Sequence, residues 1–371
     1  MTWPTEKLGS LVTIKTGRLD ANAADVDGLY PFFTCSREPL KINSHAFDCD
    51  AILIAGNGDL NVKHYNGKFN AYQRTYVVTS LSDKVLDTRY LFYFMDKYVE
   101  RLRELSIGGV IKYIKLGMLT DAEIPLPPLA EQQRIAAILD KADAIRRKRQ
   151  QAIQLADDFL RAVFLEMFGD PVTNPKGFPV GTIRDLVETA NYGSSAKASE
   201  TEGEFPILRM GNITYAGAID LKDLKYIDLS EKDKPKYLVQ YGDLLFNRTN
   251  SKELVGKTAV YDRDERVAFA GYLIRVRTNE YGSPYYISGY LNSEHGKSTL
   301  RNMCKSIVGM ANINAQEMQN IQIVIPPVDL QEKYAELVKA TKNRLVPFDD
   351  SKRELEELFS SLSQKAFRGE L

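Results

Sequence analysis

Residues 124–171 read IPLPPLAEQQRIAAILDKADAIRRKRQQAIQLADDFLRAVFLEMFGDP. The stretch opens with Pro125, Pro127 and Pro128 and then continues for about forty residues without proline or glycine, which favours one long helix. Apolar side chains recur at alternating intervals of three and four, the pattern of a helix that packs along one face. A helix of this length extends about 60 Å at roughly 1.5 Å per residue. It therefore needs a partner along its length.

A second copy of the stretch lies near the C-terminus and starts VIPPVDLQEKYAELV at Val324. Gln132 aligns with Gln331 and, without any gap, Phe168 falls on Phe367. This duplication predicts an internal repeat whose two long helices pair in antiparallel fashion, like a coiled coil. The side chains predicted to pack between the helices are Ile135, Ile138, Ile145, Phe159, Val163, Tyr334, Leu337, Leu355, Leu358 and Leu362.

The second helix contains a proline, Pro347, opposite Lys148 of the first. An interior proline removes a hydrogen bond and clashes with the preceding turn, at a cost of about 3 kcal/mol. The helix is therefore predicted to kink or to restart there, with Asp349 or Asp350 as a new N-cap.

Each long helix follows a segment with mixed strand and helix signals. WPTEKLGSLV, from Trp3, matches FPVGTIRDLV, from Phe178, and CDAILIAGNGD, from Cys49, matches GDLLFNRTNS, from Gly242. Further on, Tyr90-Leu91 is aligned with Tyr290-Leu291, 200 residues later. The predicted fold is α+β, with two mixed α/β domains joined by the helix pair. The predicted boundaries are 1–124 for the first domain, 125–168 for its helix, 169–177 for a linker, 178–325 for the second domain and 326–371 for the second helix.

Bulk composition restricts the function only weakly. Lys and Arg number 49 and Asp and Glu also 49, but a neutral chain can still carry a basic cleft. Cys35, Cys49 and Cys304 lack paired spacing, which is typical of reduced thiols in the cytosol. No signal peptide and no membrane-length apolar run are apparent, so a soluble cytoplasmic protein is expected.

The motifs that resemble catalytic or cofactor sites are incomplete. In HGKST, from His295, the leading glycine of a phosphate-binding loop would fall on Leu291. GNGDLN, from Gly56, has only two of the glycines of a dinucleotide fingerprint and is typical of a turn. The three histidines lack metal-ligand spacing with the cysteines. We therefore expect a non-catalytic chain without a metal or cofactor of its own.

Polar side chains follow matching strands in both repeats, and they are of the kinds that pair with base edges and phosphates. The alternative is a set of polar loops that only cap a sheet. The predicted DNA-binding residues are Asn57, Asn61, Lys63, Tyr72, Gln73 and Arg74 in the first repeat, and Arg209, Asn212, Asn247, Arg248, Asn250, Ser251 and Lys252 in the second. The basic run Arg146–Arg149 also suits DNA or an acidic partner, but a solvated helix face is the preferred interpretation.

The alternation of domain and proline-stopped helix resembles the specificity (S) subunit of type I restriction-modification systems. The local matches are PLPPLAEQQRIAAIL, MFGDPVTNPKGFP, GDLLFNRTN and IPPVDLQEKYAEL. The resemblance implies two target recognition domains, related by a pseudo-twofold, that read a bipartite target in double-stranded DNA. It also implies that the helices act as a spacer that sets the unread gap. Two methyltransferase (M) subunits and restriction/translocase (R) subunits are the implied partners, and they would carry the S-adenosylmethionine, ATP and magnesium chemistry.

Two other classes of function remain open at this stage. One is a solitary DNA-modifying enzyme with unrecognised motifs. The other is a phage-defence scaffold that binds only protein. The residues alone give neither the target bases, nor the gap length, nor the methylated base, nor whether the system restricts.

Overall fold

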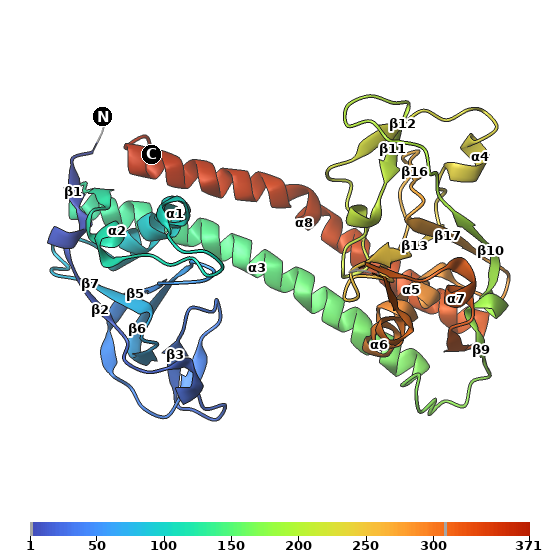
Figure 1. Cartoon of the computed structure of the whole chain (residues 1–371), viewed down its shortest axis with the longest axis horizontal. Coiled ribbons are helices and arrows are strands. Elements are labelled where there is room, and N and C mark those ends of the chain that lie inside the picture. Colours follow the sequence, from blue (N-terminus) through green and yellow to red (C-terminus); the bar gives the residue numbers. More distant parts are fainter. Residues whose placement is uncertain (1–2, 308–309) are drawn as a thin grey trace. The chain divides into compact units, whose positions relative to one another are not determined.

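The computed structural model describes residues 3–307 and 310–371, apart from the side chains of 305–310 and 346–354. The chain divides into two compact units, coloured along the sequence in Figure 1. Unit 1 comprises Met1–Gln150 and Asp349–Leu371, and unit 2 comprises Gln151–Phe348. Each unit therefore contains a globular part and one half of each long helix.

Unit 1 is built on a six-stranded sheet with strand order β2-β7-β5-β6-β3-β4. Its central strand holds the apolar run AILIA, all of it buried, which explains why this stretch lies in the middle of the sheet. Helix α1 (Thr88–Leu105) begins at Asp87, whose carboxylate caps the Tyr90 amide, and its apolar face covers the sheet. The strands are β2 (Val12–Thr16), β3 (Tyr30–Phe33), β4 (Leu40–Ile42), β5 (Phe47–Ala55), β6 (Val62–Ala71) and β7 (Thr75–Ser80).

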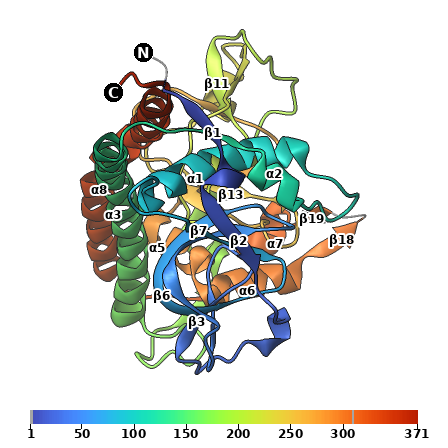
Figure 2. The same cartoon turned by 90° about the vertical axis from the view of Figure 1, so that its left-hand side faces the viewer.

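Smaller elements close unit 1 around this core. Strand β1 (Thr5–Lys7) pairs with β8 (Glu123–Pro125), which directly precedes the first long helix. Helix α2 (Leu116–Thr120) lies between α1 and β8 along the chain, and its Leu119 is fully buried. Figure 2 shows α1 and α2 beside the strands β2 and β7.

Unit 2 repeats this plan with more strands. Its main sheet has the order β10-β17-β13-β15, and helix α5 (Pro284–Asn292) packs on it. The remaining helices are α4 (Lys234–Tyr237), α6 (Glu294–Met303) and α7 (Ala315–Gln319). The strands are β9 (Val180–Thr182), β10 (Val187–Tyr192), β11 (Phe205–Leu208), β12 (Lys225–Ile227), β13 (Leu244–Asn247), β14 (Thr249–Asn250), β15 (Thr258–Val260), β16 (Ala268–Phe269), β17 (Leu273–Thr278), β18 (Lys305–Ile307), β19 (Met310–Asn312) and β20 (Gln322–Val324).

Equivalent glutamines anchor the two repeats. The Gln132 side chain accepts a hydrogen bond from the Asp87 amide and donates to the Val85 carbonyl, both at 2.9 Å. The Gln331 side chain accepts from the Ser283 amide and donates to the Tyr281 carbonyl, again at 2.9 Å. The internal repeat predicted from the sequence is therefore present in the hydrogen bonds as well.

The glutamine bonds correct the predicted alignment between the first and the second repeat. Tyr90 donates its hydroxyl to the Pro125 carbonyl, and Tyr286 donates to the matching Val324 carbonyl. Tyr90 therefore corresponds to Tyr286, and the predicted match with Tyr290 is wrong by one helical turn. The reason is a break in unit 2: Ser293 ends α5 and caps α6, so the extra turn enters after Tyr290 and not before it.

The long helices are α3 (Leu129–Phe168) and α8 (Val328–Arg368), and each contributes to both units. In unit 1 the first turns of α3, with Ile135 and Leu139, share a core with the last turns of α8, with Phe359 and Ala366. In unit 2, Phe164 and Phe168 near the end of α3 pack edge-to-face with Tyr334 near the start of α8. Within each unit the two helices therefore run antiparallel (Figure 1).

The predicted packing residues are only partly buried. Ile135 and Tyr334 are buried, whereas Ile138, Val163, Leu355 and Leu362 are partly exposed. The prediction is wrong for four residues, which are between 39% and 54% exposed: Ile145, Phe159, Leu337 and Leu358. An α-helix drifts by about 20° per heptad from a 3.5-residue repeat, so a seam extrapolated from one end loses its phase. Between Leu139 and Phe164 the buried positions of α3 are Asp143 and Arg149. On α8, Phe359 and not Leu358 packs against the unit 1 core.

Helix α8 is continuous through Pro347. The predicted restart with Asp349 or Asp350 as an N-cap is therefore wrong, because both residues lie inside the helix. A proline removes one intrahelical bond, while the bonds of the neighbouring turns can continue the helix on both sides. The side chains around Pro347 lie outside the described residues.

Replacement of Gln132 by alanine is expected to destabilise unit 1 by about 2–4 kcal/mol, because it removes the fully buried partner of one backbone amide and two carbonyls. Urea denaturation of the Gln132→Ala chain should show a lower midpoint, with faster hydrogen exchange at the Asp87 amide. Gln133→Ala, at the exposed next position, is the matched control. Equal midpoints for both variants would contradict the anchoring role.

Candidate nucleic-acid interface

Loops from separate strands of unit 1 are tied together by backbone hydrogen bonds. The Gly56 amide, after β5, donates to the Arg74 carbonyl at 2.8 Å, and the Tyr72 amide donates to the Phe33 carbonyl at 2.9 Å. Position 56 requires glycine, because a Cβ there would lie 2.4 Å from the Arg74 carbonyl oxygen. The loops after β3, β5 and β6 therefore form one continuous polar surface.

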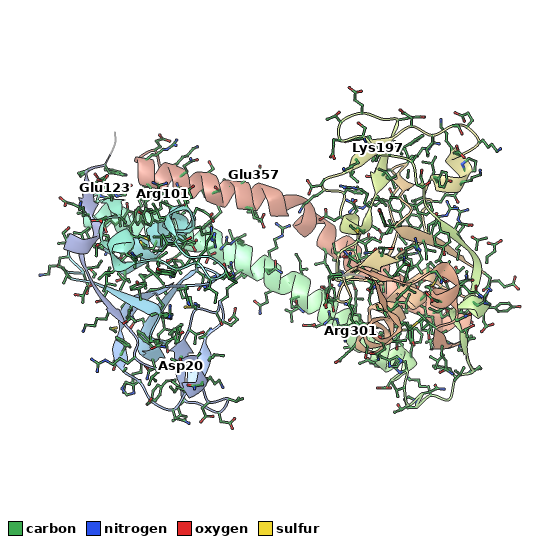
Figure 3. The ribbon with its side chains drawn as sticks, viewed as in Figure 1. Asp20, Arg101, Glu123, Lys197, Arg301 and Glu357 are labelled. Atoms are coloured by element: carbon green, nitrogen blue, oxygen red, sulfur yellow. The ribbon has the colours of Figure 1, made fainter. Side chains whose placement is uncertain are left out.

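Several predicted residues of this surface are exposed. Gln73 and Arg74 are exposed, and Asn57 and Tyr72 are partly exposed. The Gln73 amide donates to the Asp20 carboxylate at 3.3 Å. Figure 3 shows Asp20 in the loops beside β3. The amide and guanidinium groups on this surface are suited to hydrogen bonds with base edges and phosphates.

Arg37 is a candidate that the sequence did not reveal. Its Nε donates to the exposed Asp59 carboxylate at 2.9 Å, so the guanidinium stands beside the Asn57 loop. Surface ion pairs of this kind contribute about 0–1 kcal/mol, and a phosphate can displace the carboxylate at little cost. The chain offers no local pattern that would single out Arg37 among its many cations, because only the fold brings it next to Asp59.

Two residues predicted to contact DNA in unit 1 use their side chains for bonds within the loops, and their contact with DNA stays a prediction. Asn61 is 8% exposed, and its amide donates to the Cys35 carbonyl at 2.9 Å and to the Asp59 carbonyl at 2.7 Å. Lys63 turns inward and donates to Asn61 and to the Thr34 carbonyl. Asparagine is favoured both in loop caps and in base recognition, so the sequence did not distinguish the two roles.

Unit 2 carries the same backbone framework. The Arg248 amide donates to the Tyr272 carbonyl at 3.0 Å, and the Ala270 amide donates to the Leu208 carbonyl at 2.9 Å. These bonds reproduce the two that join the loops of unit 1. The polar clusters predicted in the two repeats therefore occupy equivalent positions in their units.

The predicted DNA-binding residues of unit 2 also differ in their exposure. Lys252 is exposed, Asn250 and Ser251 are partly exposed, and the Asn250 side chain accepts a bond from the Ser251 amide. Arg248 is half-buried, with its guanidinium 4.9 Å from the centre of the Tyr192 ring and a bond to Asn312 at 3.1 Å.

Buried members of the predicted set act within the fold. Asn247 is fully buried, so the prediction that it contacts DNA is wrong. Asn212 is also buried, because its amide donates to the Asp220 and Lys222 carbonyls and its oxygen accepts from the Arg209 amide. The Arg209 side chain itself donates to the Asp223 carbonyl at 2.6 Å.

The basic run on α3 is mostly a solvated face, as preferred from the sequence. Arg146, Arg147 and Lys148 are exposed, and both arginines pair with Asp143, at 2.7 and 2.6 Å. Arg149 departs from this interpretation, since it is only 6% exposed.

The described ranges, 3–307 and 310–371, contain no group of three or more His, Cys, Asp or Glu side chains placed to hold a metal ion. No helix in those ranges has the length and apolar character needed to span a membrane.

The family model of the type I restriction modification DNA specificity domain matches residues 1–155 and 175–356. The chain therefore belongs to this family of DNA specificity domains. The EcoDI specificity subunit of Escherichia coli is 40% identical over 48% of this chain, and the match covers 42% of that subunit. The EcoKI specificity subunit of Escherichia coli (strain K12) is 28% identical over 74% of this chain and 63% of its own length. The chain thus spans less than two thirds of these two relatives.

Two other comparisons extend over nearly the whole chain. The MjaVIII specificity subunit of Methanocaldococcus jannaschii is 22% identical over all of this chain and 93% of its own length. The crystal structure of a type I restriction-modification S subunit from M. genitalium has a TM-score of 0.67 at 17% identity, with 99% and 96% of the two chains covered. This similarity shows that the two chains share a fold.

The inward position of Lys63 predicts a pH dependence. Burial lowers the pKa of Lys63 from 10.5 to about 8. Below pH 8 the amine is charged in both states, and the folded state carries the cost of its poor hydration. Between about pH 8 and 10.5 the unfolded chain keeps a proton that the folded chain has released, so the free energy of unfolding rises with pH.

Urea denaturation at pH 7.5 and 9.5 tests this. Relative to Lys63→Met, the unmodified chain should gain stability as the pH rises. Lys68→Met, on the exposed side of the same strand, is the control for other titrating groups. A stability difference between the unmodified and Lys63→Met chains that does not change with pH would mean that Lys63 reaches solvent.

Proposed function

We propose that the chain is the non-catalytic DNA-specificity subunit of a type I restriction-modification complex, and that each unit reads one half of a bipartite target. The observation that carries the proposal is the repeated loop framework: the same backbone bonds hold exposed polar side chains at the same strand ends in both units. Two equivalent surfaces in one chain fit a target with two recognised halves. The family match adds support from an independent direction.

The long helices would serve as the spacer between the half-sites. Helix α3 is one unbroken helix of 40 residues, with its first part in unit 1 and its last part in unit 2. A helix resists changes of length, because adding a residue also rotates everything beyond it by about 100°. Such a connector would fix the number of base pairs between the two halves.

Catalysis would come from partners. Two methyltransferase subunits would bring S-adenosylmethionine, and restriction/translocase subunits would bring ATP and magnesium. Their target would be double-stranded DNA in the cytoplasm. The relatives that support this assignment are themselves described as type I restriction enzyme specificity subunits.

Methylation mapping tests the proposal first. Cells that express this chain with its neighbouring methyltransferase should show a split motif, which should disappear when this chain is deleted. Exchange of residues 178–323 for the matching segment of a relative should then change one half of the motif and leave the other half and the gap unchanged. An unchanged methylome, together with no sequence preference in binding by the purified chain, would favour the protein-binding scaffold. Turnover by the chain alone would favour the solitary enzyme.

Arg74 is expected to contribute to the half-site read by unit 1. Arg74→Ala should weaken binding to the mapped target by about tenfold, since one arginine contact to a base is worth about 1–3 kcal/mol. Fluorescence anisotropy with a labelled duplex measures this change. Lys84→Ala removes an exposed cation beyond the opposite end of β7 and should leave the affinity unchanged. Equal affinities for both variants would place Arg74 outside the interface.

A further inference from the structure

A hairpin between α1 and α2 presents apolar side chains to solvent. Its sequence is SIGGVIKY, from Ser106 to Tyr113. At its tip Val110 is fully exposed and Ile111 is 63% exposed. Single exposed apolar residues are common, but here two in a row at the tip of a turn leave most of both side chains in solvent.

Backbone bonds hold the hairpin firmly. Ile107 and Tyr113 exchange two hydrogen bonds, at 3.0 and 2.9 Å, which close the turn. Gly108 has a φ of +113°, and a Cβ there would lie 2.6 Å from the Ile111 carbonyl oxygen, so the tight turn depends on glycine. The exposed tip therefore has a defined backbone conformation.

The hairpin is also tied to the polar surface of unit 1. The Gly58 amide donates to the Lys112 carbonyl at 2.9 Å, and the Ile114 amide donates to the Gly56 carbonyl at 2.9 Å. Asn57 lies between Gly56 and Gly58 and forms an isolated antiparallel β-bridge with Tyr113. The major groove of DNA is about 12 Å wide. If Asn57 enters that groove, the neighbouring hairpin lies within the same groove.

The second repeat has the same construction. Its sequence from Ser306 reads SIVGMANI, and strands β18 and β19 pair in antiparallel fashion. The Ile313 amide donates to the Arg248 carbonyl at 2.9 Å, the counterpart of the bond from Ile114 to Gly56. Both repeats therefore place a hydrogen-bonded pair of segments beside the polar loop that follows the matching strand.

We infer that Val110 and Ile111 contact the C5-methyl groups of thymines in the major groove, next to the bases reached from Asn57. This inference rests on the proposed function. Asparagine and glutamine pair with adenine in the major groove, and the thymine of the same base pair shows its methyl group in that groove. An amide and an apolar tip side by side match the two edges of an adenine–thymine pair. Two side chains offer far less area than the roughly 800 Å² per partner of a stable protein interface, which favours DNA as the occupant.

The test removes the methyl groups from the DNA. The full-length chain, with its methyltransferase subunit, is titrated with the mapped target and with the same target carrying deoxyuridine for each thymine of the unit 1 half-site. Burial of one methyl-sized group is worth about 0.8 kcal/mol, so each contacted thymine should account for roughly fourfold in affinity. A double variant, Val110→Ser with Ile111→Ser, should lose the same affinity on the thymine target and show no further loss on the deoxyuridine target.

Leu81→Ser is the matched control, since Leu81 is 61% exposed and follows the far end of β7. It should bind both duplexes like the unmodified chain. Equal affinity of the unmodified chain for both duplexes, or a half-site without thymine on either strand, would overturn the inference while leaving the proposed function intact. So would a double variant that binds DNA normally but loses its methyltransferase subunit, which would make the hairpin a protein contact. Absence of any sequence-specific binding would instead remove the proposed function.

Discussion

The buried glutamine in the first turn of each long helix is the contact on which the rest of the structure depends. Gln132 and Gln331 are both fully buried, and each joins three backbone groups: an amide and a carbonyl just before helix α1 or α5, and a carbonyl of the proline stretch at its own helix start. An unpaired buried polar group costs about 1–3 kcal/mol, so neither helix can leave its globular part without losing several such bonds. Each domain thereby fixes the direction of the helix that follows it.

Next to the glutamine anchors, the two repeats place their bulky side chains on different elements. The corrected register aligns Gly289 of unit 2 with Tyr93 of unit 1. Tyr93 is buried, and its hydroxyl donates to Asp140 on α3. In unit 2 the corresponding space is occupied from the helices, because a Cβ on Gly289 would lie 2.8 Å from the Tyr334 hydroxyl and 2.9 Å from the Phe164 ring. Each globular part is therefore matched to its own half of the helix pair, although the backbone bonds are the same.

The sequence was sufficient for the architecture and insufficient for its details, for identifiable physical reasons. Proline stops, helical periodicity and a gapless duplication are local signals, and they located α3, α8 and the repeat. The register failed at Tyr290 because two Tyr-containing turns follow each other in α5, and only a hydrogen bond to Val324 shows which one matches Tyr90. The predicted helix seam was wrong at Ile145 because an α-helix drifts from a 3.5-residue repeat, so a seam extrapolated from one end of α3 loses its phase. Arg37 and the hairpin at Val110 were missed because only the fold places them beside Asn57.

The candidate interface divides its polar residues between two tasks that the sequence presents as one. Asn61 and Asn212 have their amide groups fully used by backbone carbonyls, so they hold the loops in shape. Gln73, Arg74 and Lys252 stand outside that framework with most of their hydrogen-bonding capacity free. Replacing a buried loop residue costs stability, whereas replacing an exposed one costs about 0.5 kcal/mol or less. Under the proposed function, the outer residues could therefore change the DNA sequence that is read while the inner ones keep the loops, and the helix anchors behind them, unchanged.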